Sequence, residues 1–255
     1  MNRDELAAFL NEELALDKIR DVSNNGVQCE GDCEIAGVAF AVDACRETVE
    51  KAAASDCNFL FCHHGLSWGS GFARLTGVAA RRFGLLLSHG MTLYAAHLPL
   101  DMHPRYGNNA QLCDLLKIPA ADREPFGNCH GAMIGFCGRL PQPLPWHELC
   151  RLVEAKLHTP CRGWNFGNAE KIERVAVVSG GGGDMAEQAA AAGCQCLLTG
   201  EFLHQHWHEA AECGVGVIAA GHYATETVGP RAVMRAVQQK FPAVRCCFIE
   251  APTGL

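Results

Sequence analysis

The residues best suited to chemistry in this chain are histidines and acidic residues that follow apolar segments. His63 and His64 come directly after the apolar run 58–62. Adjacent strand residues point to opposite faces, so both imidazoles can reach one ligand only if the backbone turns, which Gly65 permits. A pair of imidazoles at a strand end is a candidate metal site. The alternative is two polar residues that merely end a strand.

A second pair combines an imidazole with a carboxylate. His222 and Glu226 are spaced i and i+4 after an apolar run, so a helical turn places them on one face, a frequent geometry for two ligands of one metal. Asp101 holds the matching place after His97. Pro99 disfavours a regular helix there, so we expect a loop to present Asp101 and His97 to orient a ligand or to bind metal itself.

The number of donors favours two ions. Three imidazoles and two carboxylates are too many for one tetrahedral zinc, but they suit two adjacent divalent ions bridged by a carboxylate. Imidazole and carboxylate together are compatible with zinc, iron, manganese, cobalt or nickel.

An internal repeat explains how these donors recur along the chain. The β-branched run 38–42 matches 175–179 at an offset of 137 residues, and each run precedes a turn, an alanine-rich segment and another apolar run. Later, GMTLYAAHLPLD (90–101) matches GVGVIAAGHYATE (214–226). Each copy therefore predicts strand, helix, strand, with polar residues at the carboxyl ends of strands, where such sheets bind ligands.

The predicted fold is α/β: two intertwined, internally duplicated α/β layers with mostly parallel sheets and the metal site in the crevice between them. We place the first half at residues 1–128 and the second at 129–255, where FGNCHG precedes the strand GAMIGFCGRL. The C-terminal segment is free to pack on the first half.

Composition narrows the class of protein. The chain has 255 residues, 49% of them hydrophobic and 19% charged, which predicts a globular protein with a sizeable core and excludes disorder, collagen and coiled coil. A net charge of −7 argues against binding to nucleic acid. The acidic N-terminus does not resemble a signal peptide, and no apolar window is long enough for a membrane span, so we expect a cytoplasmic protein.

Two further features have structural explanations. The fifteen cysteines are scattered without C-x-x-C pairs, and those in or beside apolar runs, including Cys57 and Cys194, are expected to be buried thiols rather than nucleophiles. Residues 65–69 fit the G-x-S-x-G pattern of serine hydrolases. The following segment GSGFARLTG lacks the immediate helix of a nucleophile elbow, so Ser67 is expected to have a structural or pocket-lining role.

Together, NNGVQ, SDCNFLFCHHG, YAAHLPLD, LLTGE and AAGHYATE resemble, in this order, the dinuclear-metal-centre proteins named GTP cyclohydrolase 1 type 2 homologues. The chain is similar to their short form, which has no inserted central domain. The resemblance implies a toroidal homo-hexamer whose sites open toward an internal cavity. It also implies five metal ligands, with Glu226 as the bridge: His63, His64, Asp101, His222 and Glu226.

Further candidate residues surround these ligands. The resemblance points to His208 as a neighbour of the active site, whereas His204 and His206 are expected to be solvated. Glu201 is a candidate to orient a ligand histidine or to relay protons. The glycines 180–183, followed by Asp184 as a predicted helix N-cap, could cradle a phosphate or could form a purely structural turn.

The predicted function is therefore a metal-dependent hydrolase that activates water and acts on a nucleotide or related heterocycle. If the resemblance extends to the reaction, the imidazole ring of GTP is opened with release of formate, and His97, His208 or Glu201 moves protons. The alternative is a non-catalytic, metal-binding regulatory or structural ring protein.

Overall fold

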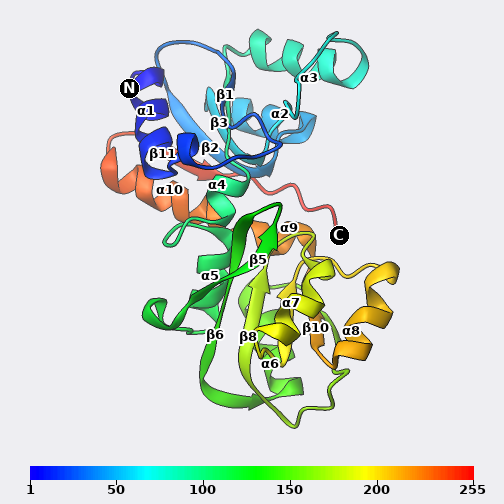
Figure 1. Cartoon of the computed structure of the whole chain (residues 1–255). Coiled ribbons are helices and arrows are strands. Elements are labelled where there is room, and N and C mark those ends of the chain that lie inside the picture. Colours follow the sequence, from blue (N-terminus) through cyan, green and yellow to red (C-terminus); the bar gives the residue numbers. More distant parts are fainter. The chain divides into compact units, whose positions relative to one another are not determined.

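The computed structural model describes all 255 residues, which form two compact units (Figure 1). Unit 1 comprises Met1–Leu100 and Pro230–Ala251, and unit 2 comprises Asp101–Gly229 and Pro252–Leu255. The chain passes from unit 1 to unit 2 within the short helix α4 (Leu98–Asp101) and returns within α10 (Val228–Lys240). No helix is long and apolar enough to cross a membrane.

Unit 1 is built on a five-stranded sheet with the order β1-β4-β3-β2-β11. Four of its strands run parallel, and only the edge strand β1 is antiparallel to its neighbour. The C-terminal strand β11 thus completes a sheet that the N-terminal part of the chain begins. The strands are β1 (Gly26–Cys29), β2 (Gly37–Asp43), β3 (Phe59–His64), β4 (Thr92–Ala95) and β11 (Arg245–Phe248).

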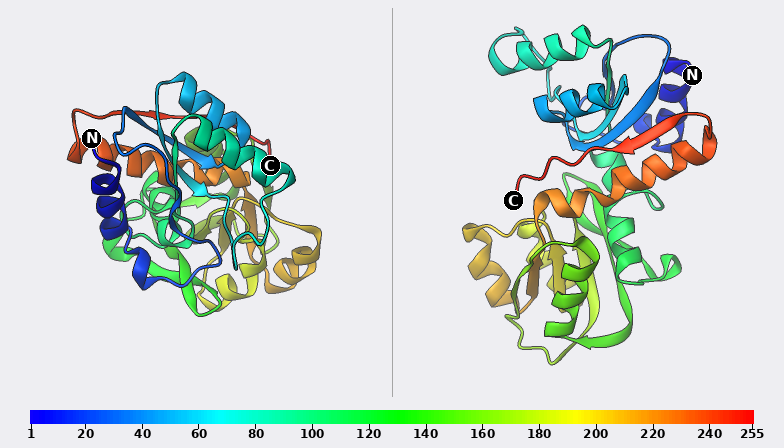
Figure 2. Two further views of the ribbon diagram at one scale, coloured as in Figure 1. Left: turned by 90° about the horizontal axis from the view of Figure 1, so that it is seen from above. Right: turned by 180° about the vertical axis from the view of Figure 1, so that it is seen from behind.

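Helices cover both faces of this sheet. Apolar residues of α2 (Arg46–Ala54) and α3 (Gly77–Ser88) pack with Leu60 and Leu93 on one face. On the other face, Tyr94 donates a hydrogen bond of 2.9 Å to Asn11, a residue of α1 (Arg3–Glu13). The helix α1 and the end of α10 lie side by side here, because Phe9 meets Phe241, just after α10, edge to face at 5.4 Å between ring centroids (Figure 2). A short 3-10 helix, η1 (Leu16–Lys18), follows α1.

Unit 2 is built on a six-stranded sheet with the order β5-β6-β8-β9-β10-β7. The middle strands β8, β9 and β10 are parallel, whereas β5, β6 and β7 are antiparallel to their neighbours. The sheet is therefore more mixed than the predicted, mostly parallel one, because the segment around 128–130 forms a hairpin instead of a crossover. The strands are β5 (Glu124–Cys129), β6 (Ala132–Pro145), β7 (Arg162–Trp164), β8 (Lys171–Val178), β9 (Cys196–Thr199) and β10 (Gly216–Ala219).

The core of unit 2 lies between this sheet and its helices. Apolar residues of α5 (Asn108–Leu115) and α6 (Trp146–Leu157) pack with alternate strand residues such as Val175 and Leu198. Ala186 of α7 (Ala186–Ala191) and Ala210 of α8 (Trp207–Cys213) pack with Val217. The remaining elements are short and lie in connections: η2 (Ala120–Asp122), η3 (Gly183–Met185), η4 (His204–His206) and α9 (His222–Glu226).

The α/β class and the duplicated strands follow the prediction, since β2 and β8 hold the two matched runs of the repeat. Two local predictions are wrong. Asp101 ends the helix α4 instead of lying in a loop, because Pro99 stands in the first turn, where its missing N–H group is tolerated. Asp184 lies inside the 3-10 helix η3 and does not cap α7.

Candidate metal centre

Three histidines of unit 1 form the first cluster of possible metal ligands. His63 and His64 end β3, and His97 follows β4, the neighbouring parallel strand. Their ring centroids are 4.6 to 5.7 Å apart, and one nitrogen of each lies within 4.8 Å of the others. The ends of two parallel strands therefore bring together imidazoles that lie far apart in the sequence.

Each of these rings is held at its Nδ1 atom by a hydrogen-bond acceptor. The Nδ1 atom of His63 lies 3.0 Å from the carbonyl oxygen of Ala96, and that of His64 lies 2.9 Å from the carboxylate of Asp43, the last residue of β2. Carbonyl and carboxylate oxygens only accept, so Nδ1 carries the proton. In this tautomer the Nε2 atom of each ring carries the lone pair that can bind a metal ion.

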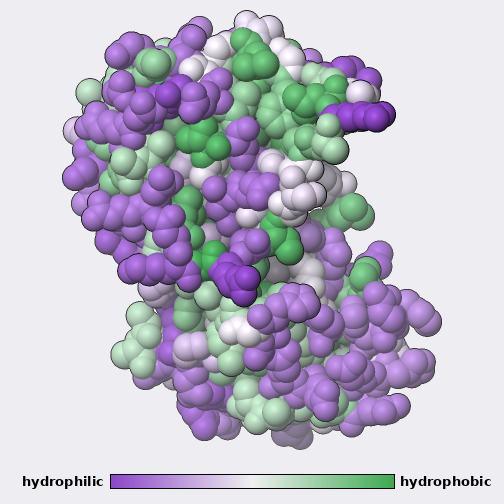
Figure 3. Space-filling view, turned by 45° about the horizontal axis from the view of Figure 1, so that its top comes forward, coloured by the Kyte–Doolittle hydropathy of each residue, from purple (hydrophilic) through white to green (hydrophobic).

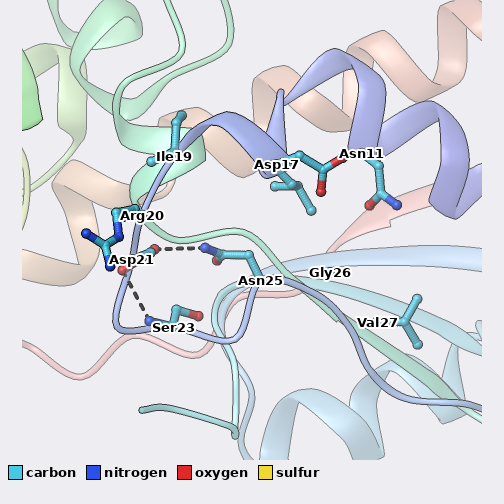
Figure 4. Close-up of a pocket in the computed structure, with 10 residues that line it drawn as sticks. Asn11, Asp17, Ile19, Arg20, Asp21, Ser23, Asn25, Gly26 and Val27 are labelled. Carbon is cyan, nitrogen blue, oxygen red and sulfur yellow. Dashed lines mark hydrogen bonds between the residues drawn. The ribbon is translucent and has the colours of Figure 1, made fainter. Parts of the chain in front are cut away.

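Asp21 holds the third ring. Its carboxylate is 1% exposed and lies 3.0 Å from the Nδ1 atom of His97. It also accepts hydrogen bonds from the backbone N–H groups of Ser23 and Leu98 and from the side chain of Asn25. Figure 4 shows two of these bonds at the wall of a cavity of about 530 Å³. Burial raises the pKa of Asp21, but the hydrogen bonds from His97 and Asn25 outweigh it and hold this pKa below its usual range.

The second cluster lies in unit 2 and contains His222, Glu226 and Glu201. The short helix α9 begins at His222 and ends at Glu226, as the i and i+4 spacing predicts. The Nδ1 atom of His222 is 2.7 Å from Glu201, and its Nε2 atom is 3.2 Å from Glu226. The hydrogen bond to Glu226 is the main cause that raises the pKa of His222 to about 9, and Glu201 adds to it. The imidazole and the carboxylate thus already face one another.

Glycines allow this second cluster to pack against the end of β8. A Cβ atom on Gly180 would lie 2.2 Å from the Glu226 carboxylate and 3.1 Å from Nε2 of His222. The backbone φ angle of Gly180 is +60°, in the left-handed region that favours glycine. The N–H groups of Gly180 and Gly182 donate to the hydroxyls of Thr225 and Thr199. The glycine run therefore serves close packing, and two of its N–H groups are already used within the protein.

Asp101, the fifth predicted ligand, lies in unit 2 and is buried, with 6% exposure. Its Oδ1 atom accepts hydrogen bonds from the side chains of Asn108, at 2.8 Å, and Ser179, at 3.2 Å. Both of these bonds fix the orientation of the Asp101 carboxylate. Ser179 directly precedes Gly180, and Gly180 packs against Glu226. The carboxylates of Asp101 and Glu226 therefore both contact residues just after β8.

The other candidates occupy different environments. His208 is an exposed residue of α8, and His204 is exposed in η4, whereas His206 is half-buried. Ser67 accepts a hydrogen bond of 2.7 Å from Asn24, and the helix that follows this segment begins only at Gly77. The G-x-S-x-G segment is therefore a turn tied to the N-terminal NNGVQ segment, without the geometry of a nucleophile elbow.

The donor set fits divalent transition metals. The first cluster offers imidazole nitrogen, and the second offers imidazole nitrogen and carboxylate oxygen, so neither offers thiolate. This suits the five metals named from the sequence. Every clustered histidine has an oxygen at Nδ1, the arrangement by which proteins fix the tautomer of a metal-binding histidine and strengthen it as a ligand. The residues present are therefore those that such a metal would need.

Comparison with known proteins gives the class of this chain. It belongs to the Duf34/NIF3 (NGG1p interacting factor 3) family, whose model matches residues 1–254. A Pyrococcus abyssi protein named GTP cyclohydrolase 1 type 2 homolog is 44% identical over 256 residues, covering all of both chains. A protein of the same name from Deinococcus radiodurans is 38% identical and covers all of this chain and 95% of its own length. The resemblance expected from the motifs is thus confirmed.

Solved structures of relatives agree with the fold. Protein ybgI, described as of unknown function, superposes with a TM-score of 0.92 at 32% identity over the full length of both chains. A protein from Thermus thermophilus gives a TM-score of 0.87 at 35% identity, also over both full lengths.

Sequence reasoning found the histidines but missed the residues that hold several of the donors. Asp43 and Asp21 orient His64 and His97, and Asn108 and Ser179 fix Asp101. The sequence did contain a signal for Asp43. This acidic residue ends the apolar strand β2, and β2 pairs with β3, the strand that ends in His63 and His64. Asp21 had no comparable signal, because it acts across 76 positions of the chain.

We predict that Gly180→Ala disturbs the second cluster, because the new methyl group would meet Glu226 and a left-handed residue would gain a Cβ atom. Metal affinity should fall on the order of ten- to a hundredfold, as for loss of a residue that supports a ligand. Titration calorimetry with zinc on the purified protein would measure this.

Gly181→Ala is the matched control, since a Cβ atom there would meet no atom within 4 Å. Its metal affinity should equal that of the unchanged protein. Equal affinities for all three proteins would show that the close approach of Gly180 does not position Glu226.

Proposed function

We propose that this protein is a metal-dependent hydrolase with two divalent ions per chain. The observation that carries the proposal is a hydrogen-bond arrangement that four histidines share. Each has an oxygen acceptor at its Nδ1 atom: His63, His64, His97 and His222. For His63, His64 and His97 this acceptor leaves the lone pair on Nε2, as a metal ligand requires. His222 would exchange the proton that it shares with Glu226 for the ion.

The names of the relatives support the substrate class. Proteins with up to 44% identity over the whole chain are named GTP cyclohydrolase 1 type 2 homologs. By this likeness the substrate is a nucleotide or related heterocycle, and the reaction is the hydrolytic opening of the imidazole ring of GTP, which releases formate.

The candidate residues have two kinds of role, metal binding and proton transfer. The ions would be held by His63, His64, Asp101, His222 and Glu226, and by family likeness Glu226 would be the carboxylate that the two ions share. When bound, two divalent ions lower the pKa of a water molecule toward neutrality and supply the nucleophile of a hydrolysis. Glu201 orients His222 through Nδ1 and can accept or return a proton there. His97, which Asp21 orients, is the candidate to move protons in unit 1. His208, exposed on α8, is assigned a helper role by family likeness alone.

We expect elemental analysis of the gently purified protein to find about two divalent ions per chain, because five nitrogen and oxygen ligands exceed one tetrahedral shell. Glu226→Gln should weaken both ions together, since a shared carboxylate contributes charge to each. The same variant should lose turnover of GTP measured as formate release, and a chelator should abolish turnover in the unchanged protein.

Ser67→Ala is the control for this experiment, because Ser67 lies in a turn and should leave both metal content and turnover unchanged. A stoichiometry of one ion or less, unaltered by added zinc or manganese, would contradict the dinuclear site. Full metal content with no turnover of any nucleotide in a panel would favour the alternative, a non-catalytic metal-binding ring protein.

We also propose that the chain forms a closed homo-hexamer. Support comes from large apolar side chains exposed in and before α3 of unit 1, which a partner copy could cover: Phe72, Leu75, Val78 and Leu87. On the face drawn in Figure 3, separate hydrophobic patches interrupt a mostly hydrophilic surface. Closed symmetric assemblies are the usual way to bury such patches.

Light scattering at micromolar concentration should give about six times the chain mass of 27.5 kDa. Leu75→Glu should dissociate the assembly if the exposed residues in and before α3 lie in an interface, because the new carboxylate would be buried without a partner. A monomer at that concentration in the unchanged protein would contradict the proposal.

A further inference from the structure

Two cysteines of unit 1 that are far apart in the sequence meet in its core. The sulfur atoms of Cys57, just before β3, and Cys247, on the edge strand β11, are 3.7 Å apart. Both belong to the apolar face that α2 and α3 cover. Gly37 makes room for the first thiol, since a Cβ atom there would lie 3.0 Å from the Cys57 sulfur.

A second pair occupies unit 2. The side chains of Cys137, on β6, and Cys194, just before β9, lie near each other, and each thiol affects the pKa of the other. Both residues are buried, with 2% and 4% exposure. The guanidinium group of Arg174 lies 3.3 Å from the Cys137 sulfur.

The two pairs occupy equivalent places in the internal repeat. Cys57 and Cys194 are related by the offset of 137 residues that also relates the strands β2 and β8. Their partners correspond through the sheets: Cys247 is paired with Ala39 of β2, and Cys137 is paired with Ala176 of β8, the residue that the same offset relates to Ala39. The equivalence holds although β11 is parallel to β2 and β6 is antiparallel to β8.

From this placement we infer that Cys57–Cys247 and Cys194–Cys137 are two equivalent dithiol sites, one in each unit, that close to disulfides when the protein meets a small peroxide. The fifteen cysteines are free in the structure, so this is the reduced form. The sulfur atoms of Cys57 and Cys247 are already in contact at 3.7 Å, and closing the bond brings them to about 2.05 Å.

The surroundings favour one sulfur of each pair as the attacking group. Cys247 is half-buried whereas Cys57 is buried, and the contact with Cys57 and the charge of Arg245 lower the pKa of Cys247. The guanidinium group of Arg174 contacts the sulfur of Cys137, and the neighbouring Cys194 thiol and the charge of Arg174 lower the pKa of Cys137. A thiolate is the reactive form of cysteine, so these two residues react first.

The chemistry balances with hydrogen peroxide as the oxidant. The Cys247 thiolate attacks one peroxide oxygen, the O–O bond breaks, and the leaving hydroxide takes up a proton as water, leaving a sulfenic acid. The sulfur of Cys57 then attacks the sulfenic sulfur and displaces its oxygen, which leaves as water with the Cys57 proton. Two thiols lose two electrons, and one peroxide becomes two waters. Cys137 and Cys194 follow the same steps.

Each disulfide would fasten a strand of its sheet to a helix–strand turn. In unit 1 the bond joins the edge strand β11 to the turn between α2 and β3. In unit 2 it joins β6 to the turn between α7 and β9. Burial of three of the four sulfurs, Cys57, Cys137 and Cys194, restricts the oxidant to a molecule of the size of peroxide and disfavours glutathione disulfide.

The test treats the purified full-length protein with a small excess of hydrogen peroxide in the presence of a chelator, then counts free thiols and maps disulfides by peptide mass spectrometry. We expect the loss of four of the fifteen thiols and the two linkages 57–247 and 137–194. Cys247→Ser should lose the first linkage and keep the second. Cys246→Ser, the matched control at the adjacent position, should keep both.

Four results would overturn the inference. These are an unchanged thiol count, linkages between other cysteines, linkages between chains, and sulfinic acid at Cys247 or Cys137 without a disulfide. A linkage in one unit alone would overturn the claim that the pairs are equivalent. Because mass mapping of the unchanged chain gives the answer, the test does not depend on whether a variant folds or on any enzymatic activity.

Discussion

The acceptor at the Nδ1 atom of each clustered histidine is the interaction on which the site depends. An imidazole can bind a metal through either nitrogen, and without a partner it would sample both tautomers and several ring orientations. The carbonyl of Ala96 and the carboxylates of Asp43, Asp21 and Glu201 remove that freedom. The ring orientations are therefore already set, so an ion that bound here would require little further ordering of its ligands.

Sheet architecture brings ligands and acceptors together. In unit 1 the ends of β2, β3 and β4 are adjacent, so Asp43, His64 and His97 come from three neighbouring strands. In unit 2 the end of β8 contacts both carboxylates, Asp101 through Ser179 and Glu226 through Gly180. The duplication of the fold thus supplies two sets of strand ends, each with its own donors.

The sequence predicted the parts of the site that rest on local pattern. Short apolar runs ending in polar residues located the strands of the repeat, and the i and i+4 spacing located the face of α9 that carries His222 and Glu226. The expectation for Pro99 failed because α4 is only four residues long, and a proline is compatible with the first turn of a helix. The capping role of Asp184 failed because the chain forms a 3-10 turn before α7.

Partners that are distant in the sequence could not be predicted from such patterns. Asp21 reaches His97 from an irregular loop, and tertiary contacts that leave no periodicity in the sequence set the position of this loop. The cysteine pairs were missed for a similar reason, because β11 joins β2 from the far end of the chain and only this strand pairing reveals the partner of Cys57.

The central claim is that metal binds at histidine nitrogen and carboxylate oxygen in a protein that also carries fifteen cysteines. X-ray absorption spectroscopy at the zinc edge of the zinc-loaded protein tests it directly. The account predicts that the nearest neighbours of zinc are nitrogen and oxygen atoms at about 2.0–2.2 Å, with the more distant scattering of imidazole rings. Sulfur neighbours at about 2.3 Å would contradict it, because the metal would then lie among the thiols.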